Sequence, residues 1–364
     1  MLPDGRRLGA HLALGNGLVK AADRAVEIGV SALQVFSDNP TAWRRRAAPS
    51  PELPAFRARL AAGSIQPLAI HASYLVNLAG SEPAYHERSV ALLATELRAA
   101  RRYGAAIVNV HIGSHGGAGI EAGIERLVTA IRRAIAAEGE PDEDDDGAGA
   151  GDGAAAGDGA AAAAPDAAAL SFAPATIALE NSAGGGFGLG IDLDELTAIA
   201  AALDAAGVAR ERVGFCLDTA HAWSAGHDLS DPAAADALID GFDRRIGLGR
   251  LALVHLNDSK SDRGSRLDRH EHVGAGRIGA AGMAHLLRHP ALAGATYILE
   301  TPGMDEGYDA INVARAVALA RGEPMAPLPP GALALRGSRS RAARPVEPSL
   351  DRDPDLGQIG RAHV

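Results

Sequence analysis

The chain has 364 residues, which is enough for one large α/β domain or two smaller ones with a substantial buried core. Its formal net charge of −10 argues against a nucleic-acid partner, but ten acidic residues and no Lys or Arg lie between Glu138 and Asp166, so the rest of the chain is close to neutral and can carry a local basic surface. Cys216 is the single cysteine, so an intramolecular disulfide is impossible. The sequence shows no signal pattern and no apolar run near the ~18 residues of a membrane span, and the protein is therefore expected to be cytoplasmic.

Eight strands and eight helices are predicted to alternate along the chain. Short apolar runs bounded by turn residues predict strands at 8–12, 32–36, 67–71, 106–111, 175–180, 213–217, 250–256 and 296–300. Helical spacing of apolar residues predicts helices at 18–28, 54–62, 84–103, 119–137, 193–206, 232–247, 279–288 and 308–321. The alternation and the number of strands indicate a (β/α)8 TIM barrel. A doubly wound sheet is the alternative, but Gly15 and Gly17 do not form its phosphate-binding fingerprint.

Two stretches do not follow this pattern. Residues 138–168 are rich in Ala, Gly and acids and almost lack large apolar side chains, so they predict a disordered insertion. Residues 323–364 are rich in Pro and Arg without periodicity and predict a flexible tail. We therefore expect a single barrel domain made of residues 1–137 and 169–322.

Metal-binding side chains stand where the predicted strands end. Six apolar runs close with such a residue: His71, His111, Glu180, Asp218, His255 and Glu300. Three more follow in loops: His221, Asp268 and His270. In a barrel the carboxyl ends of the strands form one rim, so these side chains are expected to converge there. Imidazoles with carboxylates favour Zn²⁺, with Mn²⁺ or Fe²⁺ as alternatives, and nine ligands suit three ions with one bridging carboxylate.

Each of these residues also has an ordinary structural interpretation. A lone His at a strand end is more often hydrogen-bonded than metal-bound, and Asp218 can cap a following helix. If every one of these residues were only structural, their convergence on one rim would be a coincidence. A metal site explains the convergence with a single cause. His11, which ends the first predicted strand on the same rim, is a further candidate for it, whereas His115 and His227 are interpreted as loop residues or as residues that support the ligands.

A centre of several zinc ions suits hydrolysis of a phosphodiester, because two ions about 3.5–4 Å apart can activate a water and hold the phosphate oxygens. Lys260, in a polar loop, can reach a substrate phosphate. The alternative is a sugar isomerase or epimerase on the same barrel, which needs only one or two metal ions. The group formed by His221, Asp268 and His270 is superfluous for that alternative.

Several motifs resemble those of the endonuclease IV (deoxyribonuclease IV) family of apurinic/apyrimidinic endonucleases, across roughly residues 8–320. The similar stretches are Gly9-Ala10-His11, His71-Ala72-Ser73-Tyr74-Leu75, His111-Ile112-Gly113-Ser114-His115, Glu180-Asn181, Cys216-Leu217-Asp218-Thr219-Ala220-His221, His255-Leu256-Asn257-Asp258-Ser259-Lys260, Leu267-Asp268-Arg269-His270 and Leu299-Glu300-Thr301. The resemblance implies a TIM barrel with three zinc ions. It also implies cleavage of double-stranded DNA 5′ to an abasic site, which leaves a 3′-hydroxyl and a 5′-deoxyribose phosphate.

The resemblance also implies roles for single residues. One zinc would be held by His71, His111 and Glu180; Glu180 would bridge to a second held by Asp218, His255 and Glu300; the third would be held by His221, Asp268 and His270. Within this set the catalytic role falls to Glu180, Glu300 and His111. The expected protein is a monomer.

DNA contacts are expected from the loops around this centre. Tyr74 and Leu75 match a wedge with which the family opens the duplex and flips out the abasic nucleotide. Asn39 belongs to a second such loop, although Thr41 stands there where the family has an Arg. Three basic residues complete the expected DNA contacts: Lys260, Arg266 and Arg269.

Overall fold

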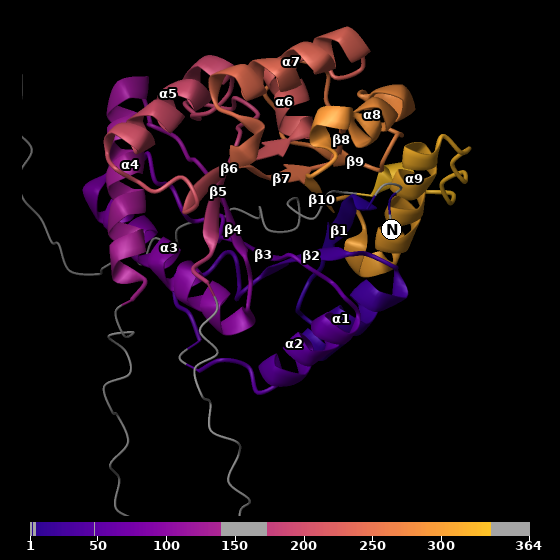
Figure 1. The fold of residues 1–364 in the computed structure, drawn as a ribbon, viewed down its shortest axis with the longest axis horizontal. Helices are drawn as coiled ribbons and strands as arrows, with labels where there is room; N and C mark the ends of the chain where they lie inside the picture. Colours follow the sequence, from indigo (N-terminus) through magenta and orange to yellow (C-terminus); the bar gives the residue numbers. More distant parts are fainter. Residues whose placement is uncertain (1, 3–4, 47, 140–172, 336–364) are drawn as a thin grey trace, which may run out of the picture.

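The computed structural model describes residues 2, 5–46, 48–139 and 173–335 (Figure 1). These residues form a closed barrel of eight parallel strands in the order β1-β10-β7-β6-β5-β4-β3-β2, which confirms the predicted TIM barrel. The strands are β1 (Arg7–His11), β2 (Ala32–Phe36), β3 (Leu68–His71), β4 (Ile107–His111), β5 (Thr176–Glu180), β6 (Val213–Asp218), β7 (Leu251–His255) and β10 (Thr296–Leu299).

The described helices surround this barrel (Figure 1). They are α1 (Leu18–Glu27), α2 (Leu53–Ala62), α3 (Pro83–Tyr103), α4 (Ile120–Ala137), α5 (Leu193–Ala205), α6 (Thr219–Ala225), α7 (Pro232–Arg245), α8 (Gly279–Arg288) and α9 (Tyr308–Arg321). Their apolar faces and the outward side chains of the strands form the main hydrophobic core. None of the described helices is both long and apolar enough to span a lipid bilayer.

The inside of the barrel is built in layers, and this layering positions the site. One apolar layer comprises Ala32, Ala69, Ile107, Ala178, Cys216, Leu253 and Ile298, one residue from each of seven strands. Because side chains alternate across a strand, the residue two positions further on also faces inward. Ala69, Ala178 and Cys216 are thus followed inward by His71, Glu180 and Asp218. The apolar layer fills the barrel below, so the next layer toward the carboxyl ends holds the polar side chains.

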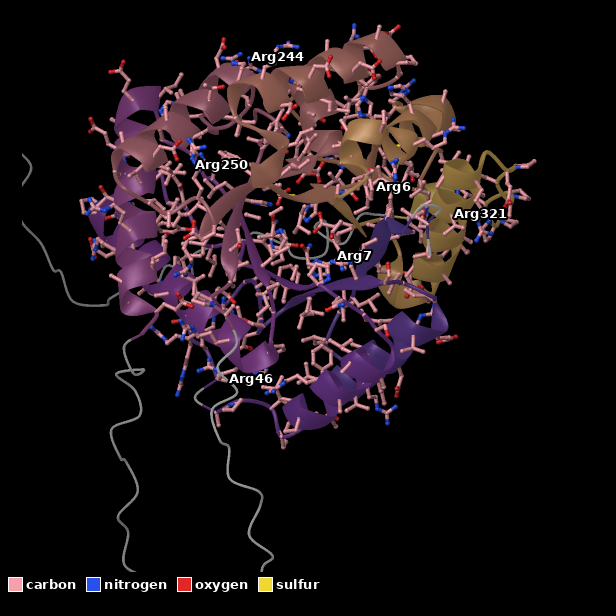
Figure 2. The ribbon with its side chains drawn as sticks, viewed as in Figure 1. Arg6, Arg7, Arg46, Arg244, Arg250 and Arg321 are labelled. Carbon is pink, nitrogen blue, oxygen red and sulfur yellow. The ribbon has the colours of Figure 1, made fainter. Side chains whose placement is uncertain are left out.

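Two structural arginines lie near the amino-terminal ends of the strands, and Figure 2 labels both. Arg250, directly before β7, donates from Nη2 to the Val213 carbonyl at 3.3 Å and pairs with Asp204. Arg6, directly before β1, donates to the carbonyls of Leu287 and Arg288 at the end of α8. Both side chains are buried and bonded to backbone carbonyls, so we interpret this end as stabilising structure.

Two local elements were not predicted. Helix α6 follows β6 without a loop, because the Asp218 side chain accepts from the His221 backbone N–H at 2.8 Å and caps the helix. The stretch between the predicted strand at 250–256 and the predicted helix at 279–288 contains a two-stranded hairpin, β8 (Asp258–Ser259) and β9 (His270–Glu271), in which Ser259 pairs with His270. Elements this short leave no periodic signal in the sequence.

The predicted insertion, 138–168, lies outside the described residues except at its start. There Glu138 is buried and accepts from Arg101 Nε at 2.8 Å and from Arg212 Nη2 at 2.6 Å, so it belongs to the barrel. The predicted tail, 323–364, is described as far as residue 335. That part lies along the barrel: the Ala326 carbonyl accepts from Arg315 Nη1 at 2.6 Å.

We expect Cys216 to resist thiol reagents in the folded protein. Its side chain belongs to the inner apolar layer, and burial raises the pKa of the thiol to about 12, so the reactive thiolate is scarce at neutral pH. Labelling with a chromogenic disulfide should be slow in native buffer and complete within the mixing time in guanidinium chloride. Rapid labelling of the native protein would contradict the burial of Cys216 in the inner apolar layer.

Candidate metal centre

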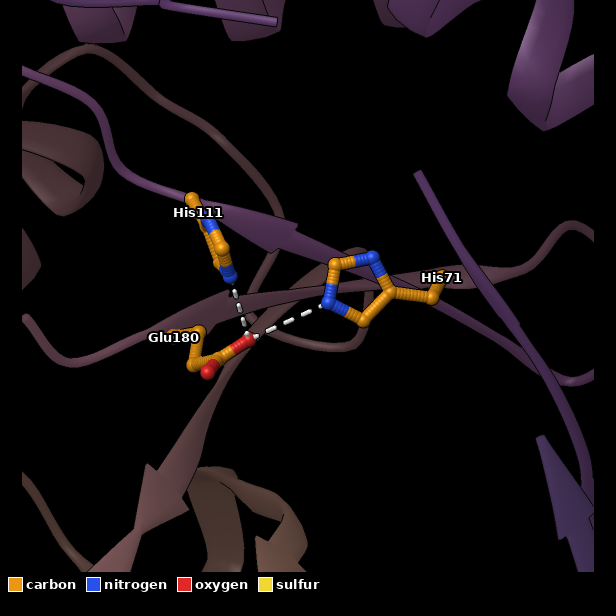
Figure 3. Close-up of side chains that lie close together, drawn as sticks. All are labelled: His71, His111 and Glu180. Atoms are coloured by element: carbon orange, nitrogen blue, oxygen red, sulfur yellow. Dashed lines mark ion pairs between the residues drawn. The ribbon is translucent and has the colours of Figure 1, made fainter. Parts of the chain in front are cut away.

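Two imidazoles and one carboxylate meet at the carboxyl ends of β3, β4 and β5 (Figure 3). His71 Nε2 lies 3.5 Å and His111 Nε2 3.3 Å from the same oxygen, Glu180 Oε2. The pairing of β4 with β5 sets His111 directly beside Glu180. His71 and Glu180 are buried, whereas the side chain of His111 is 31% exposed, so this group opens to solvent on the side of His111.

A second group adjoins the first through the other oxygen of Glu180. His255 Nδ1 lies 3.6 Å from Glu180 Oε1, 3.2 Å from Glu300 Oε2 and 3.8 Å from Asp218 Oδ2. The single carboxylate of Glu180 therefore faces both groups, one oxygen toward each. This is the arrangement that a bridging ligand between two ions requires.

The third group depends on the two short elements that were not predicted. Helix α6 carries His221, and the β8–β9 hairpin carries His270, with Asp268 just before β9. His221 Nε2 lies 3.3 Å from Asp268 Oδ2, and His270 Nε2 lies 3.1 Å from Asp268 Oδ1. Asp218 Oδ2 is also only 3.6 Å from His270 Nε2, so Asp218 stands between the second and third groups.

Hydrogen bonds to backbone carbonyls decide which nitrogen of each imidazole faces the centre. His71 Nδ1 donates to the Ala72 carbonyl at 2.8 Å, and His270 Nδ1 donates to the Glu300 carbonyl at 2.8 Å. His221 Nδ1 lies 2.9 Å from the Asn181 carbonyl. Each of these bonds leaves Nε2 with its lone pair directed inward, as in histidine ligands of metal sites.

Buried polar atoms without hydrogen bonds converge on this centre. Among the described residues they include His71 Nε2, His255 Nδ1, His270 Nε2 and Glu180 Oε1. A buried polar atom without a partner is unfavourable, and here all four belong to side chains of the types that serve as metal ligands. Residues of these types and in these numbers fit divalent ions held by nitrogen and oxygen, as zinc is.

The electrostatics of the centre keep its carboxylates ionised. Burial raises the pKa of Glu180, but the charges of His111 and His255 outweigh it and hold that pKa well below its usual value. Burial likewise raises the pKa of Glu300, but the charge of His255 and a hydrogen bond from His11 hold it well below the usual range. The buried Glu180 and the slightly exposed Glu300 thus offer two ionised carboxylates to a bound cation.

The residues expected to contact DNA surround the same rim. Tyr74 packs edge-on against Phe36 at 5.2 Å between ring centroids, and its ring centroid is 6.1 Å from that of His111. Leu75 follows it in the same loop. Asn39, after β2, accepts from both the backbone N–H and the hydroxyl of Thr41, at 3.0 and 2.9 Å. All lie on loops that follow strand ends.

The basic residues divide into two kinds. Arg266 and Arg269 are exposed and flank Asp268 in the loop before β9. The side chain of Lys260 is only 24% exposed: its Nζ donates to the Leu335 carbonyl at 2.6 Å and lies 3.8 Å from Glu271 Oε2. In this structure Lys260 therefore holds the C-terminal segment against the barrel.

Three amides orient the carboxylates and a fourth holds the backbone of Asp218; the sequence reasoning did not select any of the four. Gln34 Nε2 donates to Glu300 Oε1 at 2.9 Å, while its Oε1 accepts from His255 Nε2 at 3.0 Å. Asn109 and Asn257 donate to Glu180 and Asp218 at 2.7 Å, and Asn181 Nδ2 donates to the Asp218 carbonyl at 3.2 Å. Gln34 and Asn109 interrupt apolar strands in the sequence, which is the signal that could have found them.

Replacing Gln34 with Leu is expected to weaken the centre without unfolding the barrel. The change removes the hydrogen bond that fixes the His255 ring and one donor to Glu300 at nearly constant volume. Loss of such an outer partner lowers metal affinity or activity by roughly 10–100-fold. Competition with a chromogenic zinc chelator measures the affinity, and a Q34L protein that binds zinc as tightly as the wild type would refute the positioning role.

Comparison with known proteins shows which fold family and which protein family the chain belongs to. The family model described as xylose isomerase-like TIM barrel matches residues 22–321, so the chain is a TIM-barrel protein of that family. A protein of Methanoculleus marisnigri named "Probable endonuclease 4" is 38% identical over 313 residues, which cover 86% of this chain and 98% of that relative. The chain belongs to the endonuclease IV family.

Solved structures agree with this placement. The crystal structure of endonuclease IV from Thermus thermophilus matches with a TM-score of 0.67 at 33% identity, over 87% of this chain and 99% of that one. A D-tagatose 3-epimerase-like protein matches with a TM-score of 0.55 at 14% identity, over 87% of this chain and 97% of that one. The second match shows the shared barrel fold alone.

Proposed function

We propose that this chain is a zinc-dependent AP endonuclease, which hydrolyses the phosphodiester 5′ to an abasic site in duplex DNA and leaves a 3′-hydroxyl and a 5′-deoxyribose phosphate. Family membership supports the nuclease activity. The observation that carries the metal chemistry is the set of three adjoining ligand groups, with Glu180 between the first two and Asp218 between the second and third.

The ligand assignment is the one that the family resemblance implies, and the short distances among these side chains support it; Asp218 lies near His221 and His270 as well. His71, His111 and Glu180 would hold one ion; Glu180, Asp218, His255 and Glu300 would hold the second; His221, Asp268 and His270 would hold the third. Bound divalent ions would lower the pKa of a water and stabilise the charge that develops on the phosphate oxygens. Zinc suits the mixture of imidazoles and carboxylates, and Mn²⁺ is an alternative.

The protein's own residues supply the geometry for this reaction. The Glu180 carboxylate, ionised and fixed by the 2.7 Å hydrogen bond from Asn109, holds the first two groups at a constant separation. His111, whose side chain is 31% exposed, stands on the open side of the centre, where a phosphate would enter, and the largely buried Glu300 completes the second group. The buried ring of His255 and the apolar layer beneath it exclude water from below.

Recognition of the lesion would come from the surrounding loops. Tyr74 stands beside the first group, and it and the following Leu75 would enter the duplex. Exposed Arg266 and Arg269 would contact phosphates beside the third group. Thr41 and Asn39 hydrogen-bond to each other, so the second wedge of this chain differs in chemistry from an arginine. Lys260 would first have to release the Leu335 carbonyl before it could contact DNA.

The test is incision of an end-labelled duplex that carries one abasic site, compared with the same duplex without the lesion. Zinc-loaded protein should cut only the damaged strand and only at the lesion. Failure to cut by folded, zinc-loaded protein would contradict the proposal. Activity on a ketohexose or its phosphate would instead establish the sugar isomerase or epimerase that shares this barrel.

A further inference from the structure

Another group of metal-binding side chains lies outside the barrel, between α7 and α8. His285 is near the end of α8 and His289 follows four residues later, directly after that helix, which brings both to one side of it. Asp236 comes from α7, which packs beside α8 (Figure 1). One ligand atom of each residue lies within 4.8 Å of the other two.

The three side chains converge on a single point. Asp236 Oδ1 is 2.6 Å from His285 Nε2 and 3.1 Å from His289 Nε2. The two rings stand at 78° to each other with centroids 5.6 Å apart, so they approach the carboxylate from different directions. The side chain of His289 is 8% exposed, that of His285 27% and that of Asp236 48%, which gives the group a buried inner side and an open outer side.

We propose that Asp236, His285 and His289 bind a divalent transition-metal ion, of which zinc is the best match. Two imidazole nitrogens and one carboxylate oxygen are ligands that zinc takes, and the exposed side leaves room for water as the fourth ligand. Ligands at about 2.0–2.1 Å around a tetrahedral ion lie about 3.3 Å apart. The 3.1 Å separation is already near that value, and the 2.6 Å separation must open by about 0.7 Å at a half-exposed carboxylate.

Binding competes with an existing hydrogen bond. The Ala291 backbone N–H donates to His289 Nδ1 at 3.2 Å, which leaves the imidazole proton on Nε2, directed at Asp236. An ion at Nε2 displaces that proton to Nδ1, and the long Ala291 bond is given up. The ion therefore binds more weakly here than at the buried centre, and protons compete with it.

An ion at this position would join two helices, since Asp236 and His285 are 49 residues apart in sequence. The three ligands meet only when α7 and α8 are packed together, so the ion binds the folded chain and stabilises it. It lies on the outer helical layer and contacts none of the residues of the rim, so we expect no part in incision.

Zinc content at buffered free zinc, from nanomolar to micromolar, tests the site in the full-length protein. Four proteins are compared by elemental mass spectrometry after desalting: wild type, His285→Ala, Asp236→Asn and Asp240→Asn. Asp240 lies one turn further along α7 and is exposed, so its change removes the same charge from the same helix outside the group. Melting temperature is recorded for each protein at each zinc concentration.

Wild type and Asp240→Asn are expected to hold one zinc ion more than His285→Ala and Asp236→Asn at the upper end of the range. Only the first two should show a further rise in melting temperature as that ion binds, and all four should incise abasic DNA equally. Equal zinc content in all four proteins would overturn the proposal and leave a His–Asp–His hydrogen-bonded cluster. Because two variants remove different ligands, misfolding of one does not decide the result.

Discussion

Replacing Glu180 with Gln is expected to lower incision of abasic DNA far beyond the roughly 10–100-fold that loss of an outer hydrogen-bond partner causes. The change keeps the shape of the side chain but removes the negative charge that faces both the first and second ligand groups. The first and second ligand groups would then lose their common anion, and the bound zinc should fall by more than one ion per chain. Single-turnover incision and elemental analysis measure the two effects.

Glu125→Gln is the matched control, because Glu125 is an exposed glutamate of α4. It should incise and bind zinc as the wild type does. Full zinc content in Glu180→Gln, together with wild-type incision, would show that the carboxylate does not bridge two ions.

Loss of the third ligand group should also abolish most of the activity, but with a different metal signature. His270→Ala removes a ring whose Nε2 lies 3.1 Å from Asp268 and whose Nδ1 holds the Glu300 carbonyl. Asp268→Asn removes the carboxylate from the same group. Each change should release one zinc ion per chain and slow incision by more than ~100-fold, a loss comparable with removal of a major transition-state contact.

A double variant that combines His270→Ala with Asp268→Asn shows whether the two residues act through one shared ion or contribute separately to incision. If His270 and Asp268 act only by holding one ion, the double variant loses no more activity than either single variant. If the double variant's fold-loss of incision rate equals the product of the two single losses, the two residues contribute independently. A sugar isomerase on this barrel would not need the group at all, so undiminished activity in all three variants would contradict a three-ion nuclease.

The barrel could be predicted from the sequence because its signals are long and periodic. Each predicted strand and major helix is found within a few residues of its expected bounds. Helix α6 and the β8–β9 hairpin escaped prediction, since seven residues and two pairs of residues are too few to show a period. These two elements nevertheless carry His221 and His270, so the local chain path at the third group came only from the structure.

At the site, too, the sequence pattern identified the residues, but only the structure gave their contacts. Residues at strand ends were found because an apolar run that closes with His, Asp or Glu is conspicuous, and topology brings parallel strand ends together. For Asp218 the sequence could not decide between a helix cap and a metal ligand. In the structure Oδ1 caps α6, while Oδ2 faces His255 and His270, so the same carboxylate can serve both roles. The engagement of Lys260 with Leu335 depends on the path of the C-terminal segment, which has no periodic signal.

The chemistry of the new DNA end tests the account most directly. Hydrolysis at the proposed three-ion centre cuts 5′ to the lesion and leaves a free 3′-hydroxyl, which a DNA polymerase can extend. Product from a duplex with one abasic site should therefore be extended completely after incision by the zinc-loaded protein. A 3′ end that carries a sugar fragment and blocks extension would show bond cleavage by elimination instead, and would contradict a metal-dependent hydrolase.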